Sequence, residues 1–312
     1  MNALLLLGGL VVLIWGGDLL VKGAVALSFR LKISPLIVGL TVVSFATSAP
    51  ELLVSLQAAL QGHTDITFGN VIGSNIANIG LVLGATALFF GLPIEKQSIR
   101  FDWPAVILSY ILLSVCIFWD GELGLIDGLL FLAALCLFIL ILIQKNKKDK
   151  QSKALAELET EKNKPLSFAF FFLAAGGLAL YFGSDWLVQG ATGLAHYLGI
   201  SDRVISLSMI AIGTSVPELA ASLMAAYRKE SGISIGNLLG SNIFNVLAVL
   251  GCTASVHPLS LDDPQLLGFD FPWMWGFALV LLPLMLLPGL KIRRWAGLLL
   301  LAGYITYMTF LF

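Results

Sequence analysis

Two glutamates, Glu51 and Glu218, lie inside long apolar stretches of this 312-residue chain. A charged side chain at the centre of a membrane helix costs at least about 2.5–3.5 kcal/mol, so a carboxylate there indicates a functional site. Each glutamate closes a Thr-Ser-x-Pro-Glu motif. The two hydroxyls precede the carboxylate by four and three residues, and these spacings share one helix face. The motif therefore predicts a cluster of hard oxygen ligands.

A second motif, Gly-Asn-x-x-Gly-Ser-Asn-Ile-x-Asn, follows each glutamate at the same distance. Its Ser and its last Asn are four residues apart, so they add a hydroxyl and a carboxamide to one helix face. Such oxygen donors suit Ca²⁺ and alkali cations and argue against zinc, copper or iron. The candidate ligands from both motifs are Thr47, Ser48, Glu51, Ser74, Asn78, Thr214, Ser215, Glu218, Ser241 and Asn245.

The two sets of motifs are copies of each other. An offset of 167 residues relates Glu51 to Glu218 and Asn78 to Asn245. An offset kept over so long a span indicates two duplicated halves. Two acids buried in lipid and related by an internal repeat are typical of the cation site of a transporter.

The prolines before the glutamates predict broken helices. Pro50 lacks an N–H group and clashes with the carbonyl of Ala46, so its helix must bend or open there. The bend frees carbonyl oxygens at membrane depth, where they are costly unless they line a cavity or bind a cation. Pro217 repeats the arrangement in the second half.

Structural interpretations compete with the functional ones. Ser and Thr hydroxyls in membrane helices often bond the carbonyl four residues earlier. The Gly-x-x-x-Gly pairs, Gly69 with Gly73 and Gly236 with Gly240, are expected to be packing surfaces between helices. No such interpretation accounts for the two glutamates.

Four further polar residues have open roles. Asn75 and Asn242 are either ligands or hydrogen-bond links between helices. Asp18 and Asp185 recur at the repeat offset, and we expect a structural or gating role for them. Asp18 can pair with Lys22 four residues later.

Composition predicts an integral membrane protein. The chain is 58% hydrophobic and only 12% charged, with a mean hydropathy of +0.93, whereas soluble domains are about 25% charged. A membrane helix needs about 20 mostly apolar residues. The fold class expected is an all-α membrane protein with ten transmembrane helices, at approximately 3–28, 35–61, 68–91, 103–119, 124–144, 167–194, 203–228, 235–256, 271–289 and 293–312.

The basic residues predict the orientation. Sixteen of the 18 Lys and Arg residues lie in the odd-numbered loops, seven of them in the charged linker. Because basic loops stay cytoplasmic, both termini are expected outside and the linker inside a plasma (inner) membrane. Five spans in each half give the halves opposite topology. We therefore expect two inverted repeats, 1–144 and 167–312, joined by a cytoplasmic linker at 145–166.

Segments 46–51, 69–78, 213–218 and 236–245 together resemble the two alpha-repeats of the cation/calcium exchanger superfamily, above all prokaryotic sodium/calcium exchangers with ten helices. The resemblance covers nearly the whole chain. It implies countertransport of Na⁺ and Ca²⁺ by alternating access, with the long first and sixth helices sliding across the rest.

The resemblance also implies roles for residues. Glu51 and Glu218 would hold Ca²⁺, helped by backbone oxygens near Thr47 and Thr214. Carbonyls seven residues before each glutamate would contribute as well, and they belong to Ser44 and Ala211. Na⁺ would occupy overlapping positions around Ser48, Ser74, Asn78, Ser215, Ser241 and Asn245.

The chain departs from the family pattern at two positions. Ala46 replaces the usual glycine of the first copy, whereas Gly213 keeps it in the second. Some relatives carry an aspartate at the position of Asn245, and in potassium-dependent members that aspartate is tied to K⁺ use. We therefore expect exchange without a K⁺ requirement.

Other functions remain as alternatives. A proton/calcium exchanger could use the same glutamate pair, because burial and mutual repulsion favour neutral carboxyls. A channel is disfavoured by the inverted repeat and the proline breaks, and an enzyme by the lack of a nucleophile–base pair. We expect no cofactor, no nucleic acid and no obligatory protein partner: the substrates are Na⁺ and Ca²⁺, and the surroundings are the lipid bilayer.

Overall fold

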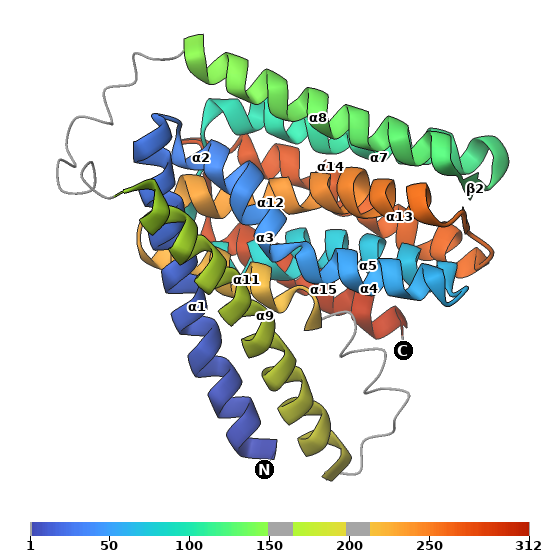
Figure 1. Ribbon diagram of the computed structural model, residues 1–312, viewed down its shortest axis with the longest axis horizontal. Helices are drawn as coiled ribbons and strands as arrows, with labels where there is room; N and C mark the ends of the chain where they lie inside the picture. Colours follow the sequence, from blue (N-terminus) through green and yellow to red (C-terminus); the bar gives the residue numbers. More distant parts are fainter. Residues whose placement is uncertain (1, 149–164, 198–212, 312) are drawn as a thin grey trace.

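The computed structural model describes residues 2–148, 165–197 and 213–311 (Figure 1). Most of the predicted linker therefore lies outside the described residues, as does the first part of the predicted span 203–228. The helices are α1 (Asn2–Leu31), α2 (Pro35–Val38), α3 (Ser44–Thr47), α4 (Ala49–Leu60), α5 (Thr64–Ala77), α6 (Gly84–Phe90), α7 (Trp103–Asp120), α8 (Leu125–Lys148), α9 (Leu166–Tyr197), α11 (Val216–Tyr227), α12 (Ser231–Phe244), α13 (Gly251–Val256), α14 (Phe271–Met285) and α15 (Arg294–Leu311).

Short π-helical segments, whose backbone hydrogen bonds span five residues, continue several of these helices. One long membrane span therefore consists of two or three successive elements. The segments are η1 (Gly39–Val43), η2 (Asn78–Leu83), η3 (Ser98–Asp102), η5 (Asn245–Leu250) and η6 (Leu266–Asp270).

The chain is a multi-pass, helical membrane protein, as predicted. Eight helices in the described part are long and apolar enough to cross a bilayer, and there are up to nine if the bent pair Pro35–Thr47 and Ala49–Leu60 counts as one span. Of the predicted span 203–228, the described part contains α11. Large apolar side chains such as Trp119 and Ile126 are exposed on the outer helices, where lipid can cover them.

The second span bends where the proline motif predicts. Its two parts meet at Ser48 with an angle of 43°. Pro50 lies in the first turn of α4, a position that needs no N–H donor. The bend is confirmed, and it puts Glu51 in the first turn of the second part.

α1 and α9 run side by side across the rest of the molecule (Figure 1). They are antiparallel, because Gly9 lies against Leu187 and Gly23 against Leu173. A Cβ atom added at Gly9 would lie 2.6 Å from the Leu187 nitrogen, so glycine is required for this approach. Glycines recur every seven residues on both helices, and they are repeat counterparts: Gly9, Gly16, Gly23, Gly176, Gly183 and Gly190. This close packing makes α1 and α9 one structural unit.

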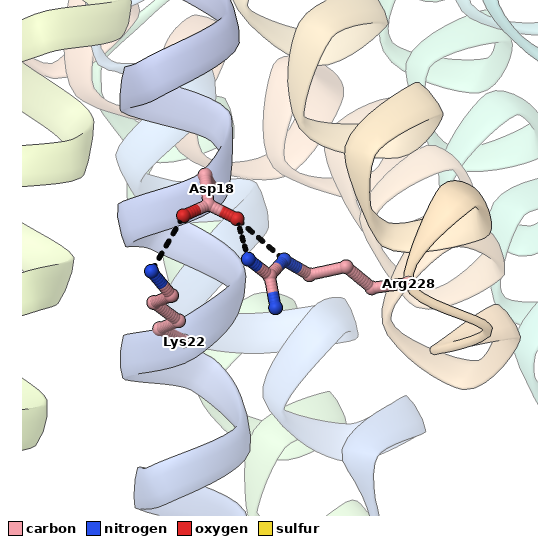
Figure 2. A network of polar contacts seen from close by, with 3 residues as sticks. All are labelled: Asp18, Lys22 and Arg228. Atoms are coloured by element: carbon pink, nitrogen blue, oxygen red, sulfur yellow. Dashed lines mark hydrogen bonds and ion pairs between the residues drawn. The ribbon is translucent and has the colours of Figure 1, made fainter.

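An ionic contact connects α1 to α11. Figure 2 shows the carboxylate of Asp18 between Lys22 of the same helix and Arg228, which caps α11. The Lys22 nitrogen lies 2.7 Å from the carboxylate, so the predicted pair at spacing four is confirmed. In the repeat counterpart, Asp185 accepts a hydrogen bond from the amide of Gln189 at 2.9 Å.

Two short antiparallel ladders were not predicted. β1 (Leu92–Pro93) pairs with β4 (Lys291–Ile292), and β2 (Glu122–Leu123) pairs with β3 (Leu259–Ser260). Each ladder has two residues per strand and connects a loop of the first half to a loop of the second. The apolar core lies between these ladders, mainly on α5, α7, α12 and α14.

Candidate cation site

The two glutamates lie at equivalent places. Each lies in the first turn of its helix, and a proline occupies the same turn. Glu51 lies in α4 and Glu218 in α11, and both side chains are fully buried. The positive end of a helix dipole stabilises a negative charge there. The fold thus places both carboxylates at helix N-termini inside the protein.

Contacts between the halves bring the two buried carboxylates into one cluster. Ser48 donates to Glu218 Oε1 at 3.4 Å, and the hydroxyls of Thr47 and Ser241 also face this carboxylate. Both oxygens of Glu51 and the Oε2 atom of Glu218 have no hydrogen-bond partner among the described residues. Buried polar atoms normally have partners, so unpaired carboxylate oxygens indicate a place for a bound cation.

Hydroxyls from opposite halves meet beside the carboxylates. Thr47 Oγ1 lies 3.4 Å from Ser241 Oγ. The repeat counterparts make the matching contact, with 3.3 Å between Ser74 Oγ and Thr214 Oγ1. The structure therefore brings together oxygen donors that are about 140 to 190 residues apart in the chain.

Four asparagines form two matching hydrogen bonds between the halves. Asn78 donates to Asn242 Oδ1 at 3.2 Å, and Asn245 donates to Asn75 Oδ1 at 3.1 Å. The hydrogen-bond interpretation of Asn75 and Asn242 is thus confirmed. The bonds leave the carboxamide oxygens of Asn78 and Asn245 without partners in the described part of the chain. Each candidate ligand is oriented by an asparagine of the other half.

Of the two predicted carbonyl ligands, only that of Ser44 belongs to the described residues. Ala211 lies outside the described residues. The carbonyl of Ser44 accepts from the Ser48 amide at 2.9 Å and from the Thr47 hydroxyl at 3.3 Å. The Ser44 hydroxyl donates to Gly39 O at 2.8 Å and to Asn237 O at 3.1 Å, so it fixes the broken helix against α12.

The Gly-x-x-x-Gly prediction is confirmed in the second copy. A Cβ atom on Gly236 would lie 2.4 Å from Leu36 O, and one on Gly240 would lie 2.2 Å from Ser44 Oγ. These glycines let α2, η1 and α3 pack directly on α12. In the first copy the packing is looser within the described regions: a Cβ on Gly69 would meet Leu266 at 3.7 Å.

Sequence reasoning missed the residues that support the site from behind. Asn70 donates to Ser55 Oγ at 2.9 Å and to the Glu51 carbonyl at 3.2 Å. In the second half, Asn237 donates to Ser222 Oγ at 3.0 Å. The signal was present, because an Asn follows the first glycine of each second motif and a Ser follows each glutamate by four residues.

The two candidate asparagine ligands also begin π-helical segments. η2 starts at Asn78 and η5 starts at Asn245, at the repeat offset. Such segments occur frequently at functional sites, since they shift the direction of side chains along a helix. Sequence patterns gave no sign of them.

The arrangement fits a transported cation with oxygen ligands. The cluster offers two carboxylates, hydroxyls and carboxamide oxygens, several of them unpaired. Within the described ranges, no three His, Cys, Asp or Glu side chains gather as they would at a zinc or iron centre. This is the donor set that hard cations such as Ca²⁺ and Na⁺ prefer.

The helical membrane fold and the buried acidic cluster are those expected of a membrane transporter for cations. Comparison with known proteins gives its family: residues 1–144 and 168–312 match the model of the sodium/calcium exchanger proteins, and the chain belongs to this family. It is therefore a cation/calcium antiporter and not an enzyme, which confirms the family predicted from the motifs.

Individual relatives agree with this assignment. The chain is 40% identical over 309 residues to the putative antiporter CaxA of Alkalimonas amylolytica, covering 97% of this chain and 96% of the relative. It is 34% identical to the sodium/calcium exchanger MaX1 of Methanosarcina acetivorans, covering 100% and 98%. A solved structure of the sodium-calcium exchanger NCX_Mj superposes with a TM-score of 0.81 at 29% identity, covering 99% and 97% of the two chains.

Proposed function

We propose that this chain exchanges Na⁺ for Ca²⁺ across the membrane by alternating access. The observation that carries the proposal is the pair of fully buried glutamates whose oxygens are mostly unpaired among the described residues. Two such charges are costly in a low dielectric. One Ca²⁺ offsets them, and so do several Na⁺, but both loads compete for the same oxygens. This mutual exclusion couples the two fluxes.

The proposed ligands are those that the family resemblance implies. Glu51 and Glu218 hold Ca²⁺, with backbone oxygens near Thr47 and Thr214 and, seven residues before each glutamate, those of Ser44 and Ala211. Na⁺ uses overlapping positions around the hydroxyls and carboxamides, which are Ser48, Ser74, Asn78, Ser215, Ser241 and Asn245. The asparagine pair that orients Asn78 and Asn245 supports their place in this shell.

The proposed architecture has ten transmembrane helices in two inverted repeats, 1–144 and 167–312, with the linker at 145–166. Three observations support an approximate two-fold axis in the membrane plane. The repeat counterparts α1 and α9 are antiparallel. The asparagine bonds are exchanged between the halves, as in a symmetric interface. The ladder β1–β4 also maps onto β3–β2.

The basic loops support an orientation with both termini outside and the linker in the cytoplasm of a cell whose plasma membrane holds the protein. We further propose that exchange needs no K⁺, because Asn245 leaves the centre with two carboxylates. The absence of a K⁺ requirement is supported by the acids around the pair: within the described residues, no third carboxylate lies with Glu51 and Glu218.

The test is Ca²⁺ uptake into vesicles that contain the purified chain. Uptake should start when an outward Na⁺ gradient is imposed, and it should be insensitive to K⁺. Uptake driven by a proton gradient without Na⁺ would favour the proton/calcium alternative. Ca²⁺ flux that continues without any counter-ion would contradict exchange altogether.

A further inference from the structure

The contacts of the site fall into two classes when the halves are compared. The asparagine bonds, Asn78 to Asn242 and Asn245 to Asn75, occur in both halves with nearly equal lengths. Among the described residues, other contacts occur in one half alone. The difference matters because the halves are chemically almost identical at these positions.

The clearest unequal contact involves a threonine and an asparagine. Thr47 Oγ1 donates to Asn237 Oδ1 at 3.1 Å. The counterpart of this pair is Thr214 and Asn70, but Asn70 Oδ1 is buried and has no partner among the described residues. The amide nitrogen of each asparagine makes the same kind of bond: Asn70 donates to the Ser55 hydroxyl, and Asn237 donates to the Ser222 hydroxyl.

A serine and a glutamate show the same inequality. Ser48 donates to Glu218 at 3.4 Å. Their counterparts are Ser215 and Glu51, and neither the Ser215 hydroxyl nor the Glu51 carboxylate has a hydrogen-bond partner in the described part of the structure. Both unequal contacts therefore connect the bent helix of the first half to the second half.

Packing on the same side is tight. A Cβ atom on Gly236 would lie 2.4 Å from Leu36 O, and one on Gly240 would lie 2.7 Å from Leu40 O. No path for an ion exists between α2–η1–α3 and α12 at this separation. Segment 35–47 is thus closed against α12 in the described structure, and the Thr47–Asn237 bond belongs to this contact.

In a transporter with inverted repeats, the two access states approximately exchange the conformations of the halves. Contacts present in both halves then persist, while contacts present in one half switch. We propose that Asn70 and Asn237 are positioning residues that alternate as acceptors: Asn237 holds Thr47 when the face of 35–47 is closed, and Asn70 holds Thr214 when the opposite face is closed. The inference rests on the proposed alternating access and adds two residues to it.

Hydrogen–deuterium exchange of the segment 35–47, measured in lipid nanodiscs without Na⁺ or Ca²⁺, tests this switch. Asn237→Ala removes a bond of the state shown, so amide protection in 35–47 should fall about three- to tenfold, as expected for loss of one hydrogen bond. Asn70→Ala removes a bond of the other state, so protection in 35–47 should stay equal or rise.

Transport gives a second reading of the same shift. The apparent KM for Ca²⁺ on the face of 35–47 should fall in Asn237→Ala and rise in Asn70→Ala, because affinity scales with the population of the open state. Thr47→Val should lower the amide protection of 35–47 as much as Asn237→Ala does. The double variant should lose no more protection than either single variant. Thr47→Val also serves if Asn237→Ala does not accumulate.

A fall of protection in both asparagine variants would overturn the proposal, since it would make both residues static supports. Shifts of the apparent KM for Ca²⁺ that are equal in size and sign in the two asparagine variants would also overturn the proposal. Hydrogen–deuterium exchange is measured without transported ions. It therefore stays informative even if the wild-type chain fails to transport Na⁺ against Ca²⁺. Failure of the proposed function and failure of the switch are thus separate outcomes.

Discussion

At the scale of single residues, the glutamate pair dominates. Glu51 and Glu218 are the two carboxylates of the central cluster, and no lysine or arginine pairs with them in the described part of the chain. Their charge must therefore be balanced by protons or by transported cations. Their neighbours adjust which cations are accepted.

Replacing either carboxylate by its neutral isostere should stop transport. In Glu51→Gln or Glu218→Gln, the binding of Ca²⁺ loses one of two charges, which costs about 2–5 kcal/mol for a buried charge pair. Ca²⁺ exchange in vesicles should fall at least about 30-fold. Asp262→Asn, which changes an exposed loop acid that accepts from the Ser260 hydroxyl, is the control and should retain exchange. Normal flux in either glutamine variant would remove that glutamate from the site.

A third acid should change ion choice. Asn245→Asp places a carboxylate where the Asn245 oxygen is unpaired among described residues, beside two existing acids. Added negative charge favours a larger cation load or a proton. Flux measured against K⁺ and pH should become sensitive to at least one of them. Unchanged selectivity would exclude Asn245 from the ion shell.

The structure brings together several residues of the candidate site that the sequence predicted. Spacing put Thr47, Ser48 and Glu51 on one face, and the structure brings them to the second half. Spacing could not predict which partners meet across the halves, because those contacts join residues more than a hundred positions apart. Asn70 and Asn237 were missed because their bonds run to other helices: Asn237 accepts from Thr47, 190 residues away, and Asn70 donates to Ser55, 15 residues away.

At the scale of elements, glycine packing holds the bent helix in place. The Ser44 hydroxyl and the Leu40 backbone lie so close to Gly240 that they leave no room for a methyl group. The helix therefore closes against α12 only because glycine occupies this position. Proline bends the span, and glycine lets the bent half dock.

Gly240→Ala should destabilise this docking. Overpacking of this kind typically costs about 1–3 kcal/mol. The thermal midpoint in detergent should fall, and Ca²⁺ exchange should slow. Gly276→Ala is the matched control, since nothing described lies within 4 Å of a Cβ there and alanine favours a helix. Equal midpoints for both variants would contradict a special role for Gly240.

Element boundaries followed the sequence well where composition changes sharply. The predicted spans 3–28, 124–144 and 293–312 correspond to Asn2–Leu31, Leu125–Lys145 and Arg294–Leu311. The predicted span 271–289 starts late, since η6 extends it back to Leu266, and it ends at Met285. The π-helical segments were not predictable, because they depend on tertiary packing and not on hydropathy.

At the scale of the whole molecule, α1 and α9 form a packed unit outside the other helices, joined to α11 by Asp18 and Arg228 (Figure 2). The expected gating role of Asp18 remains a prediction. The contact itself was only half predicted, since Lys22 lies in the same helix and Arg228 lies 210 residues away.

Breaking the ionic contact should loosen the unit. Arg228→Gln copies the residue at the repeat counterpart, Gln61, and leaves Asp18 with Lys22. Because these side chains are partly exposed, the loss should be small, about 0.5–1 kcal/mol of stability. Cross-linking between cysteines placed on α1 and α11 should become slower or less complete. Asp185→Asn should leave that cross-linking unchanged, and an identical loss there would contradict the assignment.

The trio around Asp18 also gives the molecule a polarity that its duplicated origin lacks. Both cations of that trio, Lys22 and Arg228, are replaced by glutamine in the other copy, at Gln189 and Gln61. A carrier with equivalent halves would work alike whichever way round it entered a vesicle. This one should not: right-side-out and inside-out preparations, given mirror-image gradients, should fill with Ca²⁺ along different time courses.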